Sequence, residues 1–417
     1  MEKLTVTLKT ITPLFLGGAE PNERPELRAP SIKGVMRFWY RAIDADYVKN
    51  EPKIFGSTDE GQGAFFLRIE KDIKEHQEWN PTHYDKLTIK HPNYDASKGH
   101  NERTWQLNGI KYLSYSLKLG DKKPKFIPTG KDIKLLFTLR QKVHPDCKKA
   151  LLSSLWLLGH IGGLGSRSRR GFGTVALQSW EWEDKSTIEL PIAHSADSPE
   201  KWLEQFQKGL NMIKAWFKGE MVVDHTVFGS NTKFYLLNGF AIDNPFEPWE
   251  MALNEAGLTM QEFRQRWDLH GSSNPLCDYK RVGGHIIDKD TRAAATTGAS
   301  KFTAAPITTP PERAAFGLPL TFRYDSLKYK RRPADTRDTP PSITFKGNQF
   351  DRNASPIHIR IIKINDKCYP LYIRLDAPLV EVKEEKGSSI GKPTGNILDT
   401  FWNELKKNNK DKERLWK

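Results

Sequence analysis

The order in which two hydrophobic periodicities alternate along the first part of the chain restricts the fold more than any other feature. A period of two residues is typical of a half-buried strand, and a period near 3.6 residues is typical of an amphipathic helix. Six segments show these periods, in the order strand, helix, strand, strand, helix, strand: 4–9, 31–43, 64–70, 132–141, 147–160 and 173–178. This order predicts a ferredoxin-like unit, an antiparallel sheet with two helices on one face.

The two helices of this unit differ in how much of their surface is apolar. The first is expected to begin with Ser31 as its N-terminal cap and to bury Ile32, Met36, Trp39 and Ile43. The second, CKKALLSSLWLLGH, is apolar over most of its circumference. It is therefore expected to lie between the sheet and another layer.

The rest of the chain predicts a second, divergent unit. Helices are expected at 198–218 and 396–408, and strands at 232–242, 316–325, 356–365 and 368–377. The sequence therefore predicts an α+β protein of two tandem ferredoxin-like (RRM-like) domains, 1–185 and 186–417. A polar insertion is expected at about 71–131, and a mobile insertion at about 271–315.

The charge of the chain favours an anionic partner. Lys and Arg outnumber Asp and Glu by 65 to 51, which gives a formal net charge of +14. Cys147, Cys277 and Cys368 stand too far apart for a disulfide framework or a zinc-binding CxxC pair. No apolar run of about 18 residues and no signal-peptide core is present, so we expect a soluble, cytoplasmic protein without membrane association.

The stretch GGLGSRSRRGFG, residues 162–173, predicts an anion-binding loop. Its glycines permit positive φ and close approach of backbone to a ligand, and its arginines are forked donors for phosphate. The candidate contacts are Gly163, Gly165, Ser166, Arg167, Ser168, Arg169 and Arg170. A nucleotide P-loop is excluded because no Lys-Ser/Thr follows, and the third glycine of a dinucleotide fingerprint is missing at Ser168. The alternative is a solvated surface hairpin.

The first helix predicts a second basic surface. Its basic residues recur on the side opposite the apolar face: Arg28 just before the helix, then Lys33, Arg37 and Arg41. Stacked like charges repel by a few tenths of a kcal/mol per pair, so an anionic group is expected nearby; the alternative is a solvated face. Gly34 suggests close approach by backbone or ligand, and Tyr40 is expected either to stack on a base or to pack in the core.

Evidence for catalysis is thin. Metal-free RNA cleavage needs a general acid and base, and the candidates are isolated histidines that fit structural roles better: His160, His225, His285 and His358. No H-E-x-x-H motif and no cluster of acidic residues is present, so neither a metal nor a cofactor is expected.

Several motifs resemble those of the RAMP superfamily. They are TPLFLGGA, ELRAPSIKGVMRFWYRA, IFG, IGGLGSRSRRGFGTV, and later AAFGLPLTF with DRNASPIHIR. LRAPSIKGVMRFW and RNASP resemble in particular the Cmr-one family of subunits of type III-B CRISPR effectors. The resemblance covers 4–70 and 132–180 well and 313–376 in patches.

The resemblance implies a role in antiviral defence. It implies a noncatalytic RNA-binding subunit in a Cmr ribonucleoprotein, near the 3′ end of the guide RNA (crRNA) and the adjoining target RNA, among other RAMP subunits that include the one that cuts. By that analogy Arg28, Lys33, Arg37 and Arg41 and the glycine-rich loop contact RNA, with Arg352 of RNASP as a further contact. The alternatives are a guide-processing endoribonuclease of the same superfamily and a protein-only assembly scaffold.

Overall fold

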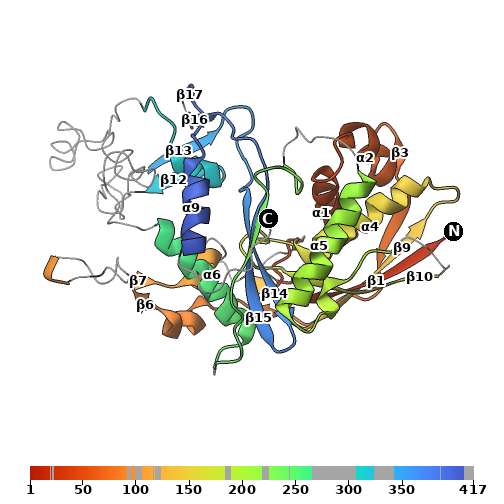
Figure 1. Ribbon diagram of the computed structural model, residues 1–417, viewed down its shortest axis with the longest axis horizontal. Helices are drawn as coiled ribbons and strands as arrows, with labels where there is room; N and C mark the ends of the chain where they lie inside the picture. Colours follow the sequence, from red (N-terminus) through yellow and green to blue (C-terminus); the bar gives the residue numbers. More distant parts are fainter. Residues whose placement is uncertain are drawn as a thin grey trace. The chain divides into compact units, whose positions relative to one another are not determined.

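A computed structural model gives the structure of the chain (Figure 1). It describes every residue except 19, 21–22, 92–93, 95, 99–105, 116, 118–123, 184–188, 218–224, 244, 265–306, 324–341, 386 and 408–417. The described residues form two compact units, one within Met1–Glu262 and Ile357–Ala377, the other within Phe263–Pro356 and Pro378–Asp411. These units are defined by contacts and do not test the predicted division into domains 1–185 and 186–417, which stays a prediction.

The N-terminal sheet has the strand order of a ferredoxin-like unit. Its antiparallel strands, in spatial order, are β10 (Val175–Trp182), β1 (Lys3–Thr10), β9 (Asp132–Leu139) and β4 (Phe65–Ile69). Helix α1 (Ala29–Arg41) lies between β1 and β4 in the chain, and α4 (Pro145–His160) joins β9 to β10. These elements confirm the predicted order of strands and helices and the α+β class (Figure 1).

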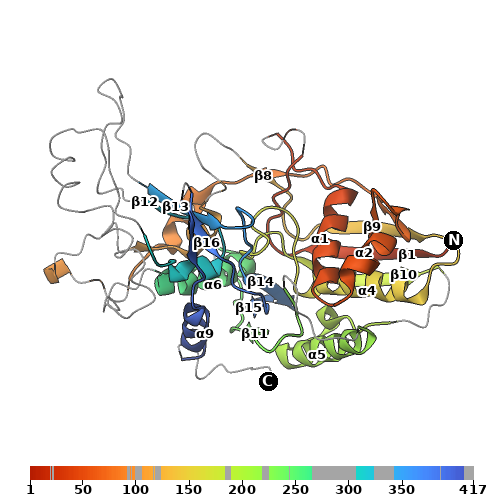
Figure 2. The ribbon, with the colours of Figure 1, turned by 90° about the horizontal axis from the view of Figure 1, so that it is seen from above.

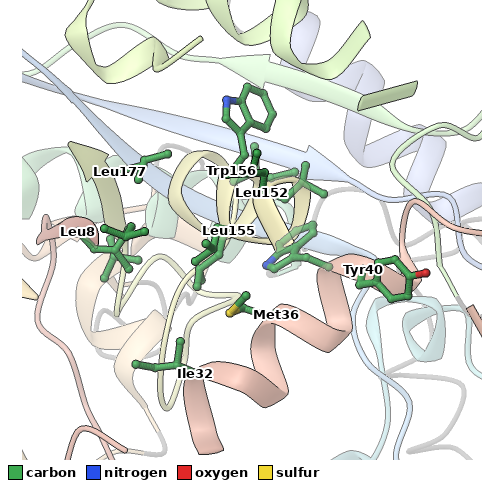
Figure 3. Packing of buried hydrophobic residues seen from close by; sticks show 14 of the residues in the cluster. Leu8, Ile32, Met36, Tyr40, Leu152, Leu155, Trp156 and Leu177 are labelled. Atoms are coloured by element: carbon green, nitrogen blue, oxygen red, sulfur yellow. The ribbon is translucent and has the colours of Figure 1, made fainter. Parts of the chain in front are cut away.

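The core between sheet and helices follows the predicted faces. Figure 3 shows Ile32 and Met36 of α1 beside Leu155 of α4, in a cluster that includes Leu8 of the sheet. Helix α4 is buried continuously from Ala150 to His160, as its apolar sequence predicted. Its far side meets another helix, α5, described next.

Helix α5 (Pro199–Trp216) provides the further layer over α4 (Figure 2). Trp156 of α4 stacks on Phe206 of α5 with ring centroids 5.2 Å apart. The predicted helix at 198–218 is thereby confirmed, and Ser198 is its N-terminal cap.

One cap prediction is wrong. Helix α1 begins at Ala29, with Arg28 as the N-cap, and Ser31 lies inside the first turn. Pro30 explains the earlier start, because the φ of proline suits the first turn of a helix and its missing N–H costs nothing there.

The insertion at 71–131 carries a core of its own where it is described. Trp79, Tyr84 and Phe126 are buried, and Trp79 meets Phe15 and Phe172 edge-on at 5.4 Å each. The insertion also contains the 3₁₀ helix η1 (Pro81–Leu87), helix α3 (Gly109–Ser114) and the short strands β5 (Gln77–Glu78), β6 (Ile89–Lys90), β7 (Gln106–Leu107) and β8 (Lys125–Phe126). It is therefore polar in composition but packed.

Besides α3, helices α2 and α6 were not expected from the sequence. Helix α2 (Tyr47–Phe55) follows α1 and leads into the short hairpin β2 (Gly56–Ser57) and β3 (Gly61–Gln62). Helix α6 (Pro248–Arg264) buries small residues such as Ala252 and Ala256, which give a weak hydrophobic signal.

A second sheet completes the first unit. Strands β11 (Lys233–Leu236), β15 (Lys367–Arg374) and β14 (Ile357–Ile364) are antiparallel neighbours in that order. The predicted hairpin at 356–377 is confirmed, and the strand predicted at 232–242 ends early, at Leu236.

The other unit has a separate sheet and core. Its strands, in spatial order, are β12 (Leu320–Arg323), β13 (Ser342–Gly347), β16 (Val382–Glu384) and β17 (Ser389–Gly391). It also holds the 3₁₀ helix η6 (Glu312–Phe316) and helix α9 (Asn396–Lys407), the predicted final helix. Of the insertion predicted at 271–315, the part up to 306 lies outside the described residues, while Ile307 and Ala314 are packed in this core. Among the described helices, none is long and apolar enough to cross a membrane.

Candidate nucleic-acid interface

The Gly/Arg loop, residues 162–173, is packed on the segment that follows β1. The Ser166 N–H donates to the Phe15 carbonyl oxygen (2.7 Å), and the Thr12 hydroxyl donates to the Gly171 carbonyl oxygen (2.8 Å). Phe172 is fully buried. The loop is therefore packed through its backbone and Phe172, while Gly165 and Ser166 are exposed. Anion binding by this loop stays a prediction.

The glycines of this loop bring it close to the chain's own backbone. A Cβ at Gly165 (φ +77°) would overlap the Phe15 carbonyl oxygen, and one at Gly173 (φ +63°) would overlap the Leu164 carbonyl oxygen. Positive φ is the region that glycine adopts at no steric cost. Within the described residues, these glycines therefore serve packing.

The structure brings the loop candidates together on one short surface. Gly163 is buried, Gly165 and Ser166 are exposed, and the following residues are half-buried: Arg167, Ser168, Arg169 and Arg170. The Arg169 guanidinium lies over the Phe38 ring of α1, 5.1 Å from its centroid. Burial lowers the pKa of Arg167, and the neighbouring Arg170 lowers it further.

Charge on this surface is poorly compensated. Burial alone lowers the pKa of Arg169. Within the described part of the chain, neither Arg169 nor Arg170 forms an ion pair. Half-buried cations that crowd one another favour the binding of an anion, because its charge offsets both the burial and the repulsion.

The positive charges of Arg37 and Arg41 on α1 are neutralised by a carboxylate of the same chain. Arg41 Nε and Nη2 lie 2.5 and 2.7 Å from the Glu51 carboxylate oxygens, and Arg37 Nη1 lies 3.4 Å from the same group. Arg37 also donates to the Phe55 and Gly56 carbonyl oxygens at the end of α2. The anionic group that the stacked charges predicted is thus a carboxylate on α2. Contact of Arg37 or Arg41 with RNA stays a prediction.

The remaining basic candidates differ in their surroundings. Lys33 lies 5.0 Å from the Phe65 ring centroid, and burial followed by the charge of Arg37 lowers its pKa. Arg28 is exposed at the N-terminus of α1. Arg352 is also exposed, but it belongs to the other compact unit.

Arg360 of β14 is the residue that sequence reasoning missed. Its side chain is 1% exposed and donates to backbone carbonyls at the end of α4, in the Gly/Arg loop and at the start of β10: Leu158, Gly159, Gly162 and Val175. Burial lowers its pKa to about 9. A lone arginine among the isoleucines of IHIRIIKI was the available signal. Arg360 positions the loop without facing solvent.

His160 is part of the core. Its Nδ1–H donates to the Trp156 carbonyl oxygen (2.7 Å) and its Nε2 accepts the Ala193 N–H (3.0 Å). Burial holds its pKa well below the ordinary value. Both ring nitrogens are engaged, so His160 is structural, as the sequence favoured. His225 Nε2 lies 2.9 Å from the Phe38 carbonyl oxygen, and His358 is buried.

The remaining candidate, Tyr40, is a core residue. Tyr40 is 1% exposed and donates to the Asp44 carboxylate, so it packs in the core and is unavailable to a base. His285 and Cys277 lie outside the described residues. Among those described, no cluster of His, Cys, Asp and Glu could hold a metal ion.

Two glycines in this region should respond in opposite directions to alanine. A Cβ at Gly34 would meet nothing within 4 Å, so Gly34→Ala should stabilise α1 by about 1 kcal/mol. Gly173→Ala should cost about 1–3 kcal/mol, because its backbone is strained for alanine and its Cβ overlaps a carbonyl. Chemical unfolding of both variants measures the difference. Destabilisation by Gly34→Ala would show that a part of the chain approaches this glycine.

The chain is similar in sequence to known proteins. A family model described as the RAMP superfamily matches residues 7–176. The CRISPR system Cmr subunit Cmr1-2 of Pyrococcus furiosus is 31% identical over 189 residues, 41% of this chain and 92% of that protein. Subunit Cmr1-1 of the same organism is 28% identical over 181 residues, 41% of this chain and 46% of that protein.

A solved structure agrees in fold. The apo crystal structure of Cmr1 from Pyrococcus furiosus superposes with a TM-score of 0.53 at 17% identity and covers 97% of both chains. The α+β fold is therefore shared with Cmr1 over nearly the whole chain. The superposition, at 17% identity, shows the fold alone, and family membership rests on the sequence matches. This chain therefore belongs to the RAMP superfamily and resembles Cmr1 of the type III-B Cmr complex.

Proposed function

We propose that the chain is a noncatalytic RNA-binding subunit of a cytoplasmic type III-B CRISPR effector complex. In this role it contacts the 3′ region of the guide RNA, the target RNA, or both, beside other Cmr subunits. The observation that carries the proposal is the rigid Gly/Arg loop, which presents Arg169 and Arg170 half-buried and without a carboxylate partner in the described chain. The relatives' names as Cmr subunits support the assembly.

The contacts proposed for the loop are with phosphates. Arginine donors match phosphate oxygens in geometry, and such contacts position a strand without reading its sequence. Of the aromatic residues near the loop and α1, Trp39, Tyr40 and Phe172 are buried, and the half-buried Phe38 stacks on His225 and contacts Arg169. Stacking on bases is therefore not expected from these elements.

The noncatalytic role is supported by the histidines. RNA cleavage without metal needs an acid or base within hydrogen-bond reach of the scissile phosphate. His160 uses both nitrogens inside the core. A guide-processing endoribonuclease of the same superfamily remains the second candidate function, because the family resemblance also allows it.

We further propose that the second half of the chain is a divergent ferredoxin-like domain. Along the sequence, β11, α6, β14 and β15 follow as β-α-β-β, the first four elements of such a unit. Strand β15 lies between β11 and β14, which is the position of the third strand in a ferredoxin-like sheet. Strands β12 and β13 then belong to an insertion between α6 and β14.

Salt dependence of RNA binding tests the proposed function. The full-length chain should bind labelled single-stranded RNA at low salt, and log K should fall linearly with log salt by about 0.7 per phosphate contacted. Fluorescence anisotropy from 50 to 500 mM salt measures this. A scaffold that binds only proteins would show no tight RNA binding even at the lowest salt.

Incubation with CRISPR repeat RNA in EDTA separates the second candidate. The noncatalytic subunit should leave the RNA intact, as judged on a denaturing gel. Site-specific cuts that persist in EDTA would overturn the noncatalytic assignment and favour the endoribonuclease.

A further inference from the structure

Helix α3 of the insertion lies beside the Gly/Arg loop because both rest on one stretch of α6. A Cβ at Gly171 of the loop would meet the Leu253 side chain, and one at Gly109 of α3 would overlap the carbonyl of the next residue, Asn254. The contact points on α6 are thus adjacent residues. The structure places an element of the insertion at the edge of the arginine surface.

Helix α3 is mounted firmly on α6. A Cβ at Gly257 of α6 would overlap the Gly109 carbonyl oxygen, so two glycines let the helices touch backbone to backbone. The Asn108 N–H donates to Gln261 Oε1 (2.9 Å), and the Ile110 N–H donates to Asn254 Oδ1 (3.2 Å). A helix held by both backbone and side-chain contacts presents its exposed residues at a fixed place.

Helix α3, which carries Tyr112, and the Gly/Arg loop contact consecutive residues of α6, Asn254 and Leu253. In keeping with this placement, Tyr112 opposes the lowering of the Arg167 pKa that burial and Arg170 cause. Tyr112 also contributes to raising the pKa of Tyr372. Tyr372 is the strand partner of Ile359, which forms a β-bridge with Arg170.

Tyr115 extends this face to solvent. It is the C-cap of α3 and keeps helical φ and ψ, so it lies on the same face as Tyr112, three residues earlier. Its side chain is 67% exposed, which is unusual for a large aromatic residue. Lys111 pairs with Asp85, so α3 adds aromatic surface here more than charge.

We propose that Tyr115, with Tyr112 beside it, is a base-stacking platform for a nucleotide of single-stranded RNA whose phosphate lies on Arg167 and Arg170. This inference rests on the proposed function and adds to it the part of the ligand that the loop cannot bind. Every base has a flat face, so the platform tolerates any sequence. The insertion is thereby part of the RNA site.

Tyr115→Ala in the full chain tests the platform with two probes: oligouridylate, and a ribose-phosphate oligomer of the same length without bases. Affinity for oligouridylate should fall about 10- to 100-fold, while affinity for the abasic oligomer stays within about twofold. Tyr115→Phe keeps the ring and should bind as the wild type does. The control is Phe66→Ala, which removes a ring 47% exposed on strand β4 and should change neither affinity.

The outcomes distinguish a failure of the proposed Tyr115 platform from a failure of the proposed RNA-binding function. Wild-type binding that Tyr115→Ala leaves unchanged, or weakens equally for both probes, overturns the platform alone. A wild-type chain that binds neither probe overturns the proposed function and the platform with it. The exposed side chain contributes little to stability, so an unfolding curve that matches the wild type confirms that the variant is folded.

Discussion

Arg360→Met is expected to lower the free energy of unfolding by about 3–5 kcal/mol. The substitution keeps the apolar stem and removes the guanidinium from the carbonyls of Leu158, Gly159, Gly162 and Val175. The Arg360 side chain is buried, so a carbonyl left without a donor beside it costs the free energy of its desolvation; the Gly159 oxygen keeps His194 Nε2 as a partner. Urea unfolding followed by circular dichroism measures the loss.

Two further variants make this result specific. Arg360→Lys should recover only part of the loss, because a single ammonium cannot reproduce the planar fork of a guanidinium. Arg352→Met removes an exposed arginine and should change the stability by less than about 0.5 kcal/mol. A loss below about 1 kcal/mol for Arg360→Met would contradict the role given to this residue.

Arg169→Glu combined with Arg170→Glu should weaken RNA binding at least about 100-fold at 0.1 M salt. The reversal replaces two attractive contacts by repulsion. The log–log salt slope should become shallower by about 1.4, the share of two phosphates on a single strand. Anisotropy titrations at several salt concentrations measure both quantities.

The matched control reverses two charges elsewhere on the same unit. Arg68 of β4 and Lys134 of β9 are exposed on neighbouring strands. Lys134 lies on the face of the sheet opposite Ile133 and Leu135, which are buried. Arg68→Glu with Lys134→Glu changes the net charge equally and should alter affinity by less than about fivefold. If both pairs weaken binding alike, the loop has no special part and overall charge explains the effect.

The stability of the loop variant also needs measurement, because the loop is packed. Losing the guanidinium over Phe38 should cost about 1 kcal/mol. A much larger loss would mean that weakened binding reports unfolding.

Periodic segments of the fold were predictable from the sequence, and aperiodic ones were not. Strands β1 and β9 and helix α1 each bury a regular set of positions, and α4 is a long apolar run buried on nearly every side, so both kinds of pattern are visible in the sequence. Helix α6 packs through alanine and glycine, and its fit depends on Gly109, far away in the sequence. Contacts between small residues leave no hydrophobic period to detect.

The candidate site was predictable in residue type and less so in environment. The glycines and arginines of the loop were recognised, but whether they pack depends on Thr12 and Phe15, which no local rule connects to them. The pairing of Arg41 with Glu51 was missed because helix α2, which carries the glutamate, is short and contains Pro52. Charge compensation is a property of the tertiary structure, so a basic stripe in sequence does not by itself indicate a basic surface.

The bonds of Arg360 also set an order of events during synthesis. Its partner at Leu158 precedes it by 202 residues, so the ribosome completes the whole N-terminal sheet long before the guanidinium emerges. Until then the carbonyls at the end of α4 lack the Arg360 guanidinium, although the Gly159 oxygen also has His194 Nε2 at 2.9 Å. A nascent chain of the N-terminal half therefore leaves the ribosome with the Gly/Arg loop unfinished, and the later hairpin of β14 and β15 completes it.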